Sequence, residues 1–148
     1  MQSGFTESTG FRPSGALRVG TDLVQVSRIA ESIERFGEKF TRRLFTEGEI
    51  AYATSSSAVS AAVQAARFAA RFAAKEATIK ALSLTQTGLD WKQIEVLRAA
   101  SGHCTLALHG IVKDAAIDAG IAELSVSLSH EGDYATAVVV ALAQSVRT

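Results

Sequence analysis

Cysteine is nearly absent from this 148-residue sequence, because Cys104 is the only one. A single cysteine excludes a disulfide within the chain and a metal site built from several cysteines. This scarcity is typical of proteins of the reducing cytoplasm, and we predict a cytoplasmic location. No supporting motif surrounds Cys104, so we interpret it as a small, partly buried apolar residue rather than a nucleophile.

An excess of charge of either sign is also missing, because Lys and Arg together number 15, as do Asp and Glu. A neutral chain lacks the broad electrostatic field that attracts nucleic acid or anionic membranes, so any basic binding surface must be local. No apolar run approaches the ~20 residues that span a bilayer. We therefore predict a soluble protein that binds neither nucleic acid nor a membrane.

Proline occurs once, in a segment at the start of the chain that is rich in Gly, Ser and Thr. This segment lacks the basic and apolar regions of a signal peptide, so we predict a disordered leader over residues 1–15. The remaining residues, 16–148, have the length and apolar content of one globular domain.

From residue 16 onward, the apolar pattern changes between strand and helix periods. Residues 16–26 are rich in β-branched and aliphatic side chains and predict a strand, in which Gly20 indicates a close backbone approach or a bend. A short helix follows this strand. We expect Ser27 to be its N-cap and Gly37 to end it.

The rest of the chain predicts further helices and a set of strands. The letters TEGE, residues 46–49, have capping-box spacing, and residues 59–82 contain neither Pro nor Gly, so both predict helices. Turn sequences ASGH and HEGD favour antiparallel pairing. The remaining predicted elements are strands at 91–99, 104–110, 123–130 and 134–142 and a helix at 111–120. The sequence thus predicts an α+β fold, with helices packed on a mainly antiparallel sheet.

Two carboxylates stand where this pattern favours apolar side chains. On a helix, Glu76 follows Phe68 and Phe72 in steps of four, so it shares the face that these rings must bury. Asp22 lies in an apolar strand. Two oxygen ligands from different elements are what Mg²⁺ usually takes from a protein, with water and substrate phosphate in its other positions. The alternative is an exposed salt bridge between Glu76 and Lys80, one turn apart.

Basic residues accompany these carboxylates. Arg67, Arg71 and Lys75 recur every four residues and predict a phosphate-binding stripe beside Glu76. The sequence SVSLSH alternates apolar and hydroxyl side chains and ends at His130, which suits a phosphate-binding strand end or a solvated edge strand. Together, the two carboxylates and the basic residues suggest that the protein acts on a phosphate-containing substrate.

Four motifs then occur in a fixed order, and together they cover nearly all of the chain after the leader. They are GTDLVQVSRI (20–29), RFAAKEATIKAL (71–82), WKQIEV (91–96) and SVSLSHEGDYATAVVV (125–140). In this order they resemble the holo-[acyl-carrier-protein] synthase family of phosphopantetheinyl transferases. The resemblance implies a homotrimer of α+β subunits with active sites between subunits. It also implies Mg²⁺-dependent transfer of phosphopantetheine from coenzyme A to a serine of an acyl carrier protein, releasing adenosine 3′,5′-bisphosphate.

The resemblance also implies roles for individual residues of the reaction site. Asp22 and Glu76 match the metal-binding carboxylates of the family. Lys80 matches the lysine that faces the pyrophosphate. Arg71 and His130 match positions that help to hold coenzyme A.

A carrier-protein surface is implied in the same way. Arg28 matches a basic residue on the helix that receives the acidic carrier, and Arg35 and Lys39 extend this surface. The family's Gly-x-Pro turn is replaced by Gly102, His103 and Cys104, which removes the fixed φ of proline near the nucleotide. The metal site is untouched by this change.

Several alternatives stay open at this point. The protein could bind coenzyme A or a carrier without turnover, or it could be an unrelated Mg²⁺-dependent phosphoesterase. The acceptor of the serine proton is either a metal-bound water or Glu76 itself. The carrier belongs to fatty-acid biosynthesis, to polyketide synthesis or to another pathway.

Overall fold

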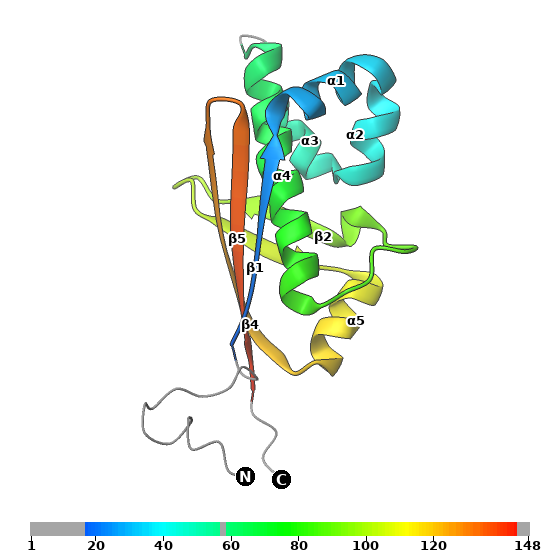
Figure 1. Ribbon diagram of the computed structural model, residues 1–148, viewed down its shortest axis with the longest axis vertical. Coiled ribbons are helices and arrows are strands. Elements are labelled where there is room, and N and C mark those ends of the chain that lie inside the picture. The colour runs from blue at the N-terminus through cyan, green and yellow to red at the C-terminus, as the bar shows by residue number, and fades with distance from the viewer. Residues whose placement is uncertain (1–16, 57–58, 145–148) are drawn as a thin grey trace, which may run out of the picture.

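The computed structural model describes residues 17–56 and 59–144, so the leader predicted at 1–15 lies outside the described residues. The chain alternates helices and strands as an α+β fold (Figure 1). In order, the elements are β1 (Leu17–Gln25), α1 (Val26–Phe36), α2 (Glu38–Leu44), α3 (Glu47–Ala53), α4 (Ala61–Leu82), η1 (Trp91–Gln93), β2 (Ile94–Arg98), β3 (Cys104–Leu108), α5 (Gly110–Asp118), β4 (Ile121–Glu131) and β5 (Tyr134–Ala143). None of the helices in these ranges is long and apolar enough to cross a bilayer.

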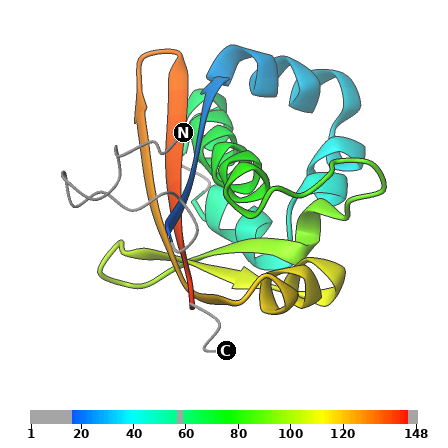
Figure 2. The same ribbon diagram turned by 60° about the horizontal axis from the view of Figure 1, so that its bottom comes forward.

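The strands form two antiparallel sheets, which confirms the predicted pairing. One sheet has the order β1-β5-β4 and the other pairs β2 with β3. In both views of the ribbon, the helices lie on one side of the three-stranded sheet, with α4 running along it (Figure 1, Figure 2). Alternate residues of β5 are buried on the side of α4. One face of the sheet is therefore covered by α4, and β1 and β4 are its edges in the described part of the chain.

The backbones of β1 and α4 come into direct contact at Gly20. A Cβ atom on Gly20 would lie 1.9 Å from the carbonyl oxygen of Ala77 and 2.7 Å from the amide nitrogen of Ala81. The close approach predicted for this glycine is confirmed, since any side chain there would push β1 away from α4. Asp22, two residues further along the same face of β1, is thereby brought close to α4.

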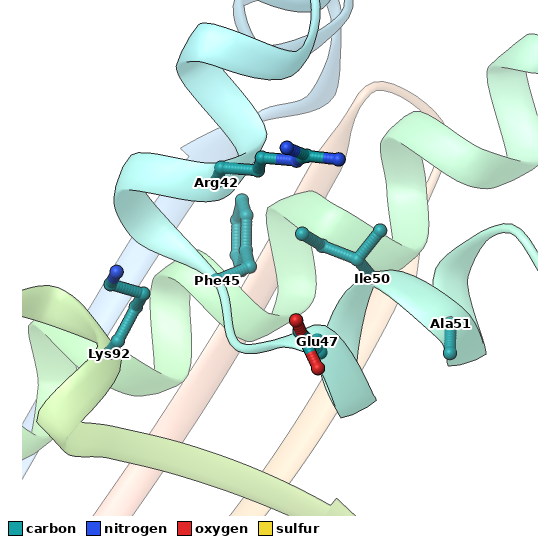
Figure 3. A pocket seen from close by; sticks show the side chains of 6 residues that line it. All are labelled: Arg42, Phe45, Glu47, Ile50, Ala51 and Lys92. Atoms are coloured by element: carbon teal, nitrogen blue, oxygen red, sulfur yellow. The ribbon is translucent and has the colours of Figure 1, made fainter.

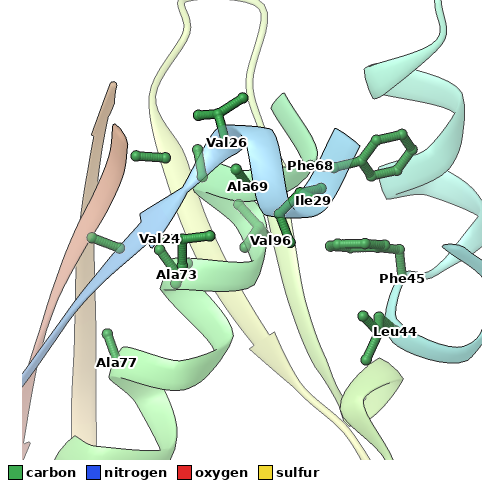
Figure 4. Packing of buried hydrophobic residues seen from close by; sticks show 14 of the residues in the cluster. Val24, Val26, Ile29, Leu44, Phe45, Phe68, Ala69, Ala73, Ala77 and Val96 are labelled. Atoms are coloured by element: carbon green, nitrogen blue, oxygen red, sulfur yellow. The ribbon is translucent and has the colours of Figure 1, made fainter. Parts of the chain in front are cut away.

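The core lies between α4, the sheet and the first three helices. Small residues of α4, such as Ala73 and Ala77, face Val24 of β1, while larger residues fill the space toward α1 and α2 (Figure 4). The rings of Phe45 and Phe68 have centroids 4.9 Å apart. Burial of Phe68 agrees with its predicted position on the inner face of the long helix.

The predicted N-cap of the first helix is wrong. The helix begins at Val26, so Ser27 lies within its first turn. The backbone amide and hydroxyl of Ser27 donate to the carboxylate of Asp133, at 2.9 and 2.7 Å. Asp133 belongs to the turn between β4 and β5, 106 residues away in sequence, and these hydrogen bonds lower its pKa. A cap supplied by tertiary contact leaves no local pattern in the sequence.

Two further elements differ from the prediction. Gly37, with φ of 57°, ends α1, but a second helix, α2, starts directly after it. The segment predicted as a strand from residue 91 begins with the 3₁₀ turn η1, which Asp90 caps through the amide of Lys92. The capping box at Thr46 and Glu49 is confirmed, because each side chain accepts the backbone amide of the other residue.

Candidate active site

Asp22 and Lys80 meet between β1 and α4. The Asp22 side chain lies on the helix-facing side of β1, as do its neighbours Gly20 and Val24. Lys80 Nζ lies 3.1 Å from Asp22 Oδ1 and donates to the carbonyl oxygen of Thr21 at 3.0 Å. The structure thus joins two residues that are 58 positions apart in sequence.

Glu76 lies one turn before Lys80 and belongs to the same group. Gln86 Nε2 donates to Glu76 Oε2 at 2.9 Å. Burial raises the pKa of Glu76, and the charge of Asp22 raises it further, against the opposing effects of Lys80 and Gln86. The two carboxylates therefore repel one another across one site.

The alternative reading of an exposed Glu76–Lys80 salt bridge is wrong. Lys80 pairs with Asp22, and Glu76 accepts its hydrogen bond from Gln86 instead. Gln86 lies in the loop that follows α4, where no periodic pattern marks a functional residue. Sequence reasoning missed this contact for that reason.

This donor set fits Mg²⁺. Within residues 17–56 and 59–144, no three side chains of His, Cys, Asp and Glu gather closely enough to form a metal site of protein ligands alone. Mg²⁺ is usually held by one or two carboxylates, with substrate phosphate and water completing its octahedron. Asp22 and Glu76 supply two such carboxylates, whose mutual repulsion a divalent cation would relieve.

A second group of predicted residues lines a basic cavity of about 210 Å³ on the other side of α4. Arg71 and His130 both line it, and none of the lining residues in the described part of the chain is a carboxylate. Its polar and ionisable lining residues are Tyr52, Arg67, Arg71, Arg98, Cys104, Ser129 and His130. Sequence reasoning missed Tyr52 and Arg98, because only folding brings α3 and β2 to this part of α4.

Arg71 is the buried centre of this cavity. Its side chain is 4% exposed, and burial lowers its pKa. Its Nη1 donates to the carbonyl oxygen of Arg67 at 3.2 Å, whereas its Nε finds no acceptor among the residues that the structure describes. A buried cation with an unused donor is well suited to bind an anion.

Lys75, predicted to belong to the same basic stripe, is instead part of the core. Its Nζ donates to Glu49 Oε1 at 2.8 Å and to the carbonyl oxygens of Trp91 and Ile94, and both charged side chains are completely buried. Glu49 Oε2 accepts the amide of Val96 at 3.0 Å. The predicted role of Lys75 in phosphate binding is therefore wrong.

The two groups of site residues are well separated within one chain. Asp22 lies on β1 and His130 on β4, which are opposite edges of the sheet with β5 between them. On α4, Arg71 and Lys80 are nine residues apart, a rotation of roughly 180° at 3.6 residues per turn. Within one chain, the Asp22 group and the basic cavity therefore lie on different sides of α4 and at opposite edges of the sheet.

The predicted carrier surface is exposed on α1 and α2. Arg28, Arg35 and Lys39 all reach solvent. Lys39 also borders a cavity of about 420 Å³, whose other lining residues are Phe36, Phe40 and Arg43. Of the three predicted residues, Lys39 thus borders an apolar hollow, together with Arg43.

A comparison with known protein families identifies the family of the chain. A profile of the 4′-phosphopantetheinyl transferase superfamily matches residues 18–139. The chain belongs to this superfamily. The prediction of a phosphopantetheinyl transferase is confirmed.

The relatives of this transferase include several holo-[acyl-carrier-protein] synthases. That of Gloeobacter violaceus is 42% identical over 122 residues, which cover 82% of this chain and 89% of the relative. That of Herpetosiphon aurantiacus is 39% identical over 133 residues, which cover 85% of this chain and 98% of the relative. The resemblance to the holo-[acyl-carrier-protein] synthase family is thus confirmed over nearly the whole length of these proteins.

Solved structures agree with the fold of the transferase. The ACPS–CoA complex of Chronobacterium ammoniagenes has a TM-score of 0.76 and 33% identity, covering 88% of this chain and 99% of that one. The holo-[acyl-carrier-protein] synthase of Helicobacter pylori in complex with coenzyme A has a TM-score of 0.70 and 29% identity, covering 83% and 98%. The predicted α+β fold is confirmed.

The transferase has another cavity, of about 410 Å³, between α2, α3 and η1. Figure 3 shows Arg42 and Lys92 at its sides, around Phe45 and Ile50. Arg42 forms an ion pair with Glu38 at 3.3 Å. None of the predicted site residues lines this cavity, so we assign it no part in the reaction.

Proposed function

We propose that the protein transfers the 4′-phosphopantetheine group from coenzyme A to a serine of an apo acyl carrier protein. The reaction depends on Mg²⁺ and yields the holo carrier and adenosine 3′,5′-bisphosphate. The observation that carries this proposal is the meeting of Asp22, Glu76 and Lys80 between β1 and α4. The holo-[acyl-carrier-protein] synthases among the relatives support it, as does the coenzyme A bound to the solved structures.

The residues of this site have different roles in the reaction. Asp22 and Glu76 hold Mg²⁺, which, when bound, offsets the negative charge of the diphosphate and of the leaving group. The ammonium of Lys80, 3.1 Å from Asp22, stabilises charge on the pyrophosphate from the same side. Arg71 and His130 hold coenzyme A through the basic cavity. The serine oxygen forms the new bond to the β-phosphorus as the bond from that phosphorus to the oxygen of adenosine 3′,5′-bisphosphate breaks, and the serine proton passes to Glu76 or to water.

The proposed function is tested by incubating the protein with coenzyme A, Mg²⁺ and an apo carrier protein. We expect the mass of the carrier to increase by one phosphopantetheine group, together with release of adenosine 3′,5′-bisphosphate. Coenzyme A that binds but leaves the carrier unmodified would indicate a binding protein. Hydrolysis of coenzyme A without a carrier would indicate a phosphoesterase.

We also propose that the protein is a homotrimer in which each active site is shared by two subunits. The face of the β1-β5-β4 sheet opposite α4 is open, and β1 and β5 present exposed apolar side chains on it: Leu17, Val19 and Leu23 are 61%, 65% and 66% exposed, and Val138 and Leu142 are 40% exposed. An apolar patch of this kind usually marks a protein interface. Contact between the β1 edge of one subunit and the β4 edge of the next would bring the Asp22 group of the first subunit to the basic cavity of the second. Three such contacts close into a ring.

Light scattering tests this assembly. We expect a trimer for the wild type and a smaller species for Val19→Glu, which places a charge in the apolar face. Transfer should be lost together with the trimer. Ile111→Glu is the matched control, because Ile111 is also exposed but belongs to α5, away from this face. A fully active monomeric wild type would contradict the shared site.

The carrier surface gives a separate prediction. Arg28→Glu reverses a charge on α1 and should raise the KM for the acidic carrier several-fold, because steering and docking contacts weaken. The KM for coenzyme A should change little, and the effect should shrink at high salt. Arg42→Glu, on the neighbouring α2, is the control. Equal effects of Arg28→Glu on both KM values would contradict docking at this surface.

A further inference from the structure

Tyr52 contacts all three arginines of the basic cavity. Its ring centroid lies 4.0 Å from the guanidinium carbon of Arg71, 5.0 Å from that of Arg67 and 5.1 Å from that of Arg98. Its backbone carbonyl oxygen also accepts a hydrogen bond from Arg67 Nη1 at 3.2 Å. One tyrosine therefore lies at the centre of three like charges.

Among the residues that the structure describes, no acidic side chain lines the cavity beside these charges. The lining residues include Arg67, Arg71, Arg98 and His130 but neither Asp nor Glu. Three guanidinium groups repel one another, so their gathering needs an attraction that offsets this repulsion. The π-face of Tyr52 supplies one, because a guanidinium within about 6 Å of an aromatic centroid is attracted to the ring. An anionic ligand would supply the rest.

The fold holds both the ring and the third arginine in place. Tyr52 follows the capping box of α3, which Lys75 anchors to α4 through Glu49. Arg98 ends β2, opposite Cys104 of β3, and its guanidinium packs over Gly102. A Cβ on Gly102, whose φ is 91°, would lie 3.3 Å from Arg98 Nη2. The absence of a side chain at Gly102 thus leaves room for the Arg98 side chain.

We propose that Tyr52 is a positioning residue that aligns Arg67, Arg71 and Arg98 toward one phosphate group, and that Arg98 contacts this phosphate directly. The inference rests on the proposed function, in which Arg71 helps to hold coenzyme A. Coenzyme A carries a diphosphate and a separate phosphomonoester, and both share the chemistry that an arginine cluster recognises. The unused Nε of the buried Arg71 is one donor available to such a group.

Direct binding of coenzyme A in the absence of carrier tests the role of Tyr52. Calorimetric titration should give similar Kd values for the wild type and Tyr52→Phe, because phenylalanine keeps the aromatic ring. Tyr52→Leu removes the ring and should weaken binding about tenfold. In turnover assays the same variant should raise the KM for coenzyme A while leaving kcat and the KM for the carrier nearly unchanged. A residue that served only in packing would not produce this split between KM values.

Arg98→Gln tests the direct contact at an exposed position where the fold is not at risk. We expect weaker binding of coenzyme A, whereas Arg42→Gln, at an exposed arginine outside the cavity, should have no effect. Titration with dephospho-coenzyme A distinguishes the two phosphates. If the phosphomonoester is the ligand, Arg98→Gln reduces the preference for coenzyme A over the dephospho compound; if the diphosphate is the ligand, binding of both weakens equally.

Unchanged binding of coenzyme A in folded Tyr52→Leu and Arg98→Gln would overturn this inference alone. A wild type that does not bind coenzyme A would overturn the proposed function and this inference with it. Thermal melts of each variant, recorded beside the titrations, show that the compared proteins are folded.

Discussion

Glu76→Gln should lower the rate of phosphopantetheine transfer by about 100-fold or more, since loss of even an indirect partner of a metal ligand commonly costs 10–100-fold. The substitution keeps the size and helix propensity of the side chain and can keep the hydrogen bond from Gln86. It removes the charge that would hold Mg²⁺ in the proposed site. We therefore expect a large loss of activity in a folded protein.

The thermal stability of Glu76→Gln should not fall with its activity. Burial and the charge of Asp22 raise the pKa of Glu76, which means that the ionised carboxylate is unfavourable in the metal-free protein. Neutral glutamine relieves this repulsion. The melting temperature of metal-free Glu76→Gln should thus equal or exceed that of the wild type, while its transfer activity falls.

The measurement is turnover against Mg²⁺ concentration for the wild type, Glu76→Gln and Asp22→Asn, with thermal melts alongside. Glu47→Gln, at an exposed position of α3, is the matched control and should behave like the wild type. Near-normal turnover with unchanged Mg²⁺ dependence in both site variants would refute the metal site, and with it most of the case for the proposed mechanism.

Lys75→Met should lower the free energy of unfolding by about 3–5 kcal/mol, the usual cost of breaking a buried ion pair. It leaves the carboxylate of Glu49 buried and charged, with only backbone amides as partners. The pair also links α3, α4 and β2, so the loss should extend beyond one contact. Urea unfolding followed by circular dichroism measures this change.

An exposed ion pair of the same chain is the control for this result. Arg42 and Glu38 are one turn apart on α2, with side chains 73% and 79% exposed. Arg42→Met should therefore change stability by less than about 1 kcal/mol. If Lys75→Met and Arg42→Met lower the free energy of unfolding by the same small amount, the buried pair contributes no more to stability than the surface pair.

The double variant Lys75→Met, Glu49→Gln gives a second check. Desolvation lowers the pKa of Lys75 in spite of the nearby Glu49. The double variant leaves neither charge buried without its partner. Removing both charges should then destabilise the protein less than removing Lys75 alone. If the double variant loses as much stability as the two single variants together, this account of the pair is contradicted.

Local patterns in the sequence were sufficient for features that depend on neighbouring residues. The absence of Pro and Gly predicted α4, and the TEGE spacing predicted the capping box at Thr46. Gly20 within a strand indicated a close backbone approach or a bend, and the structure shows the approach, to α4, because only glycine allows two backbones to come so close. The alternation of β4 predicted its apolar and hydroxyl faces. Each of these signals arises within a few residues of chain.

Only the tertiary structure decided which charged groups meet. Lys75 and Lys80 lie in one helix, yet the first is buried against Glu49 and the second reaches Asp22 on β1. Helical spacing places side chains on faces of α4, but the elements packed against each face set their partners. The cluster around Tyr52 likewise depends on three segments that folding brings together. Ion pairs and cavities are properties of packing between distant segments, and a local pattern does not encode them.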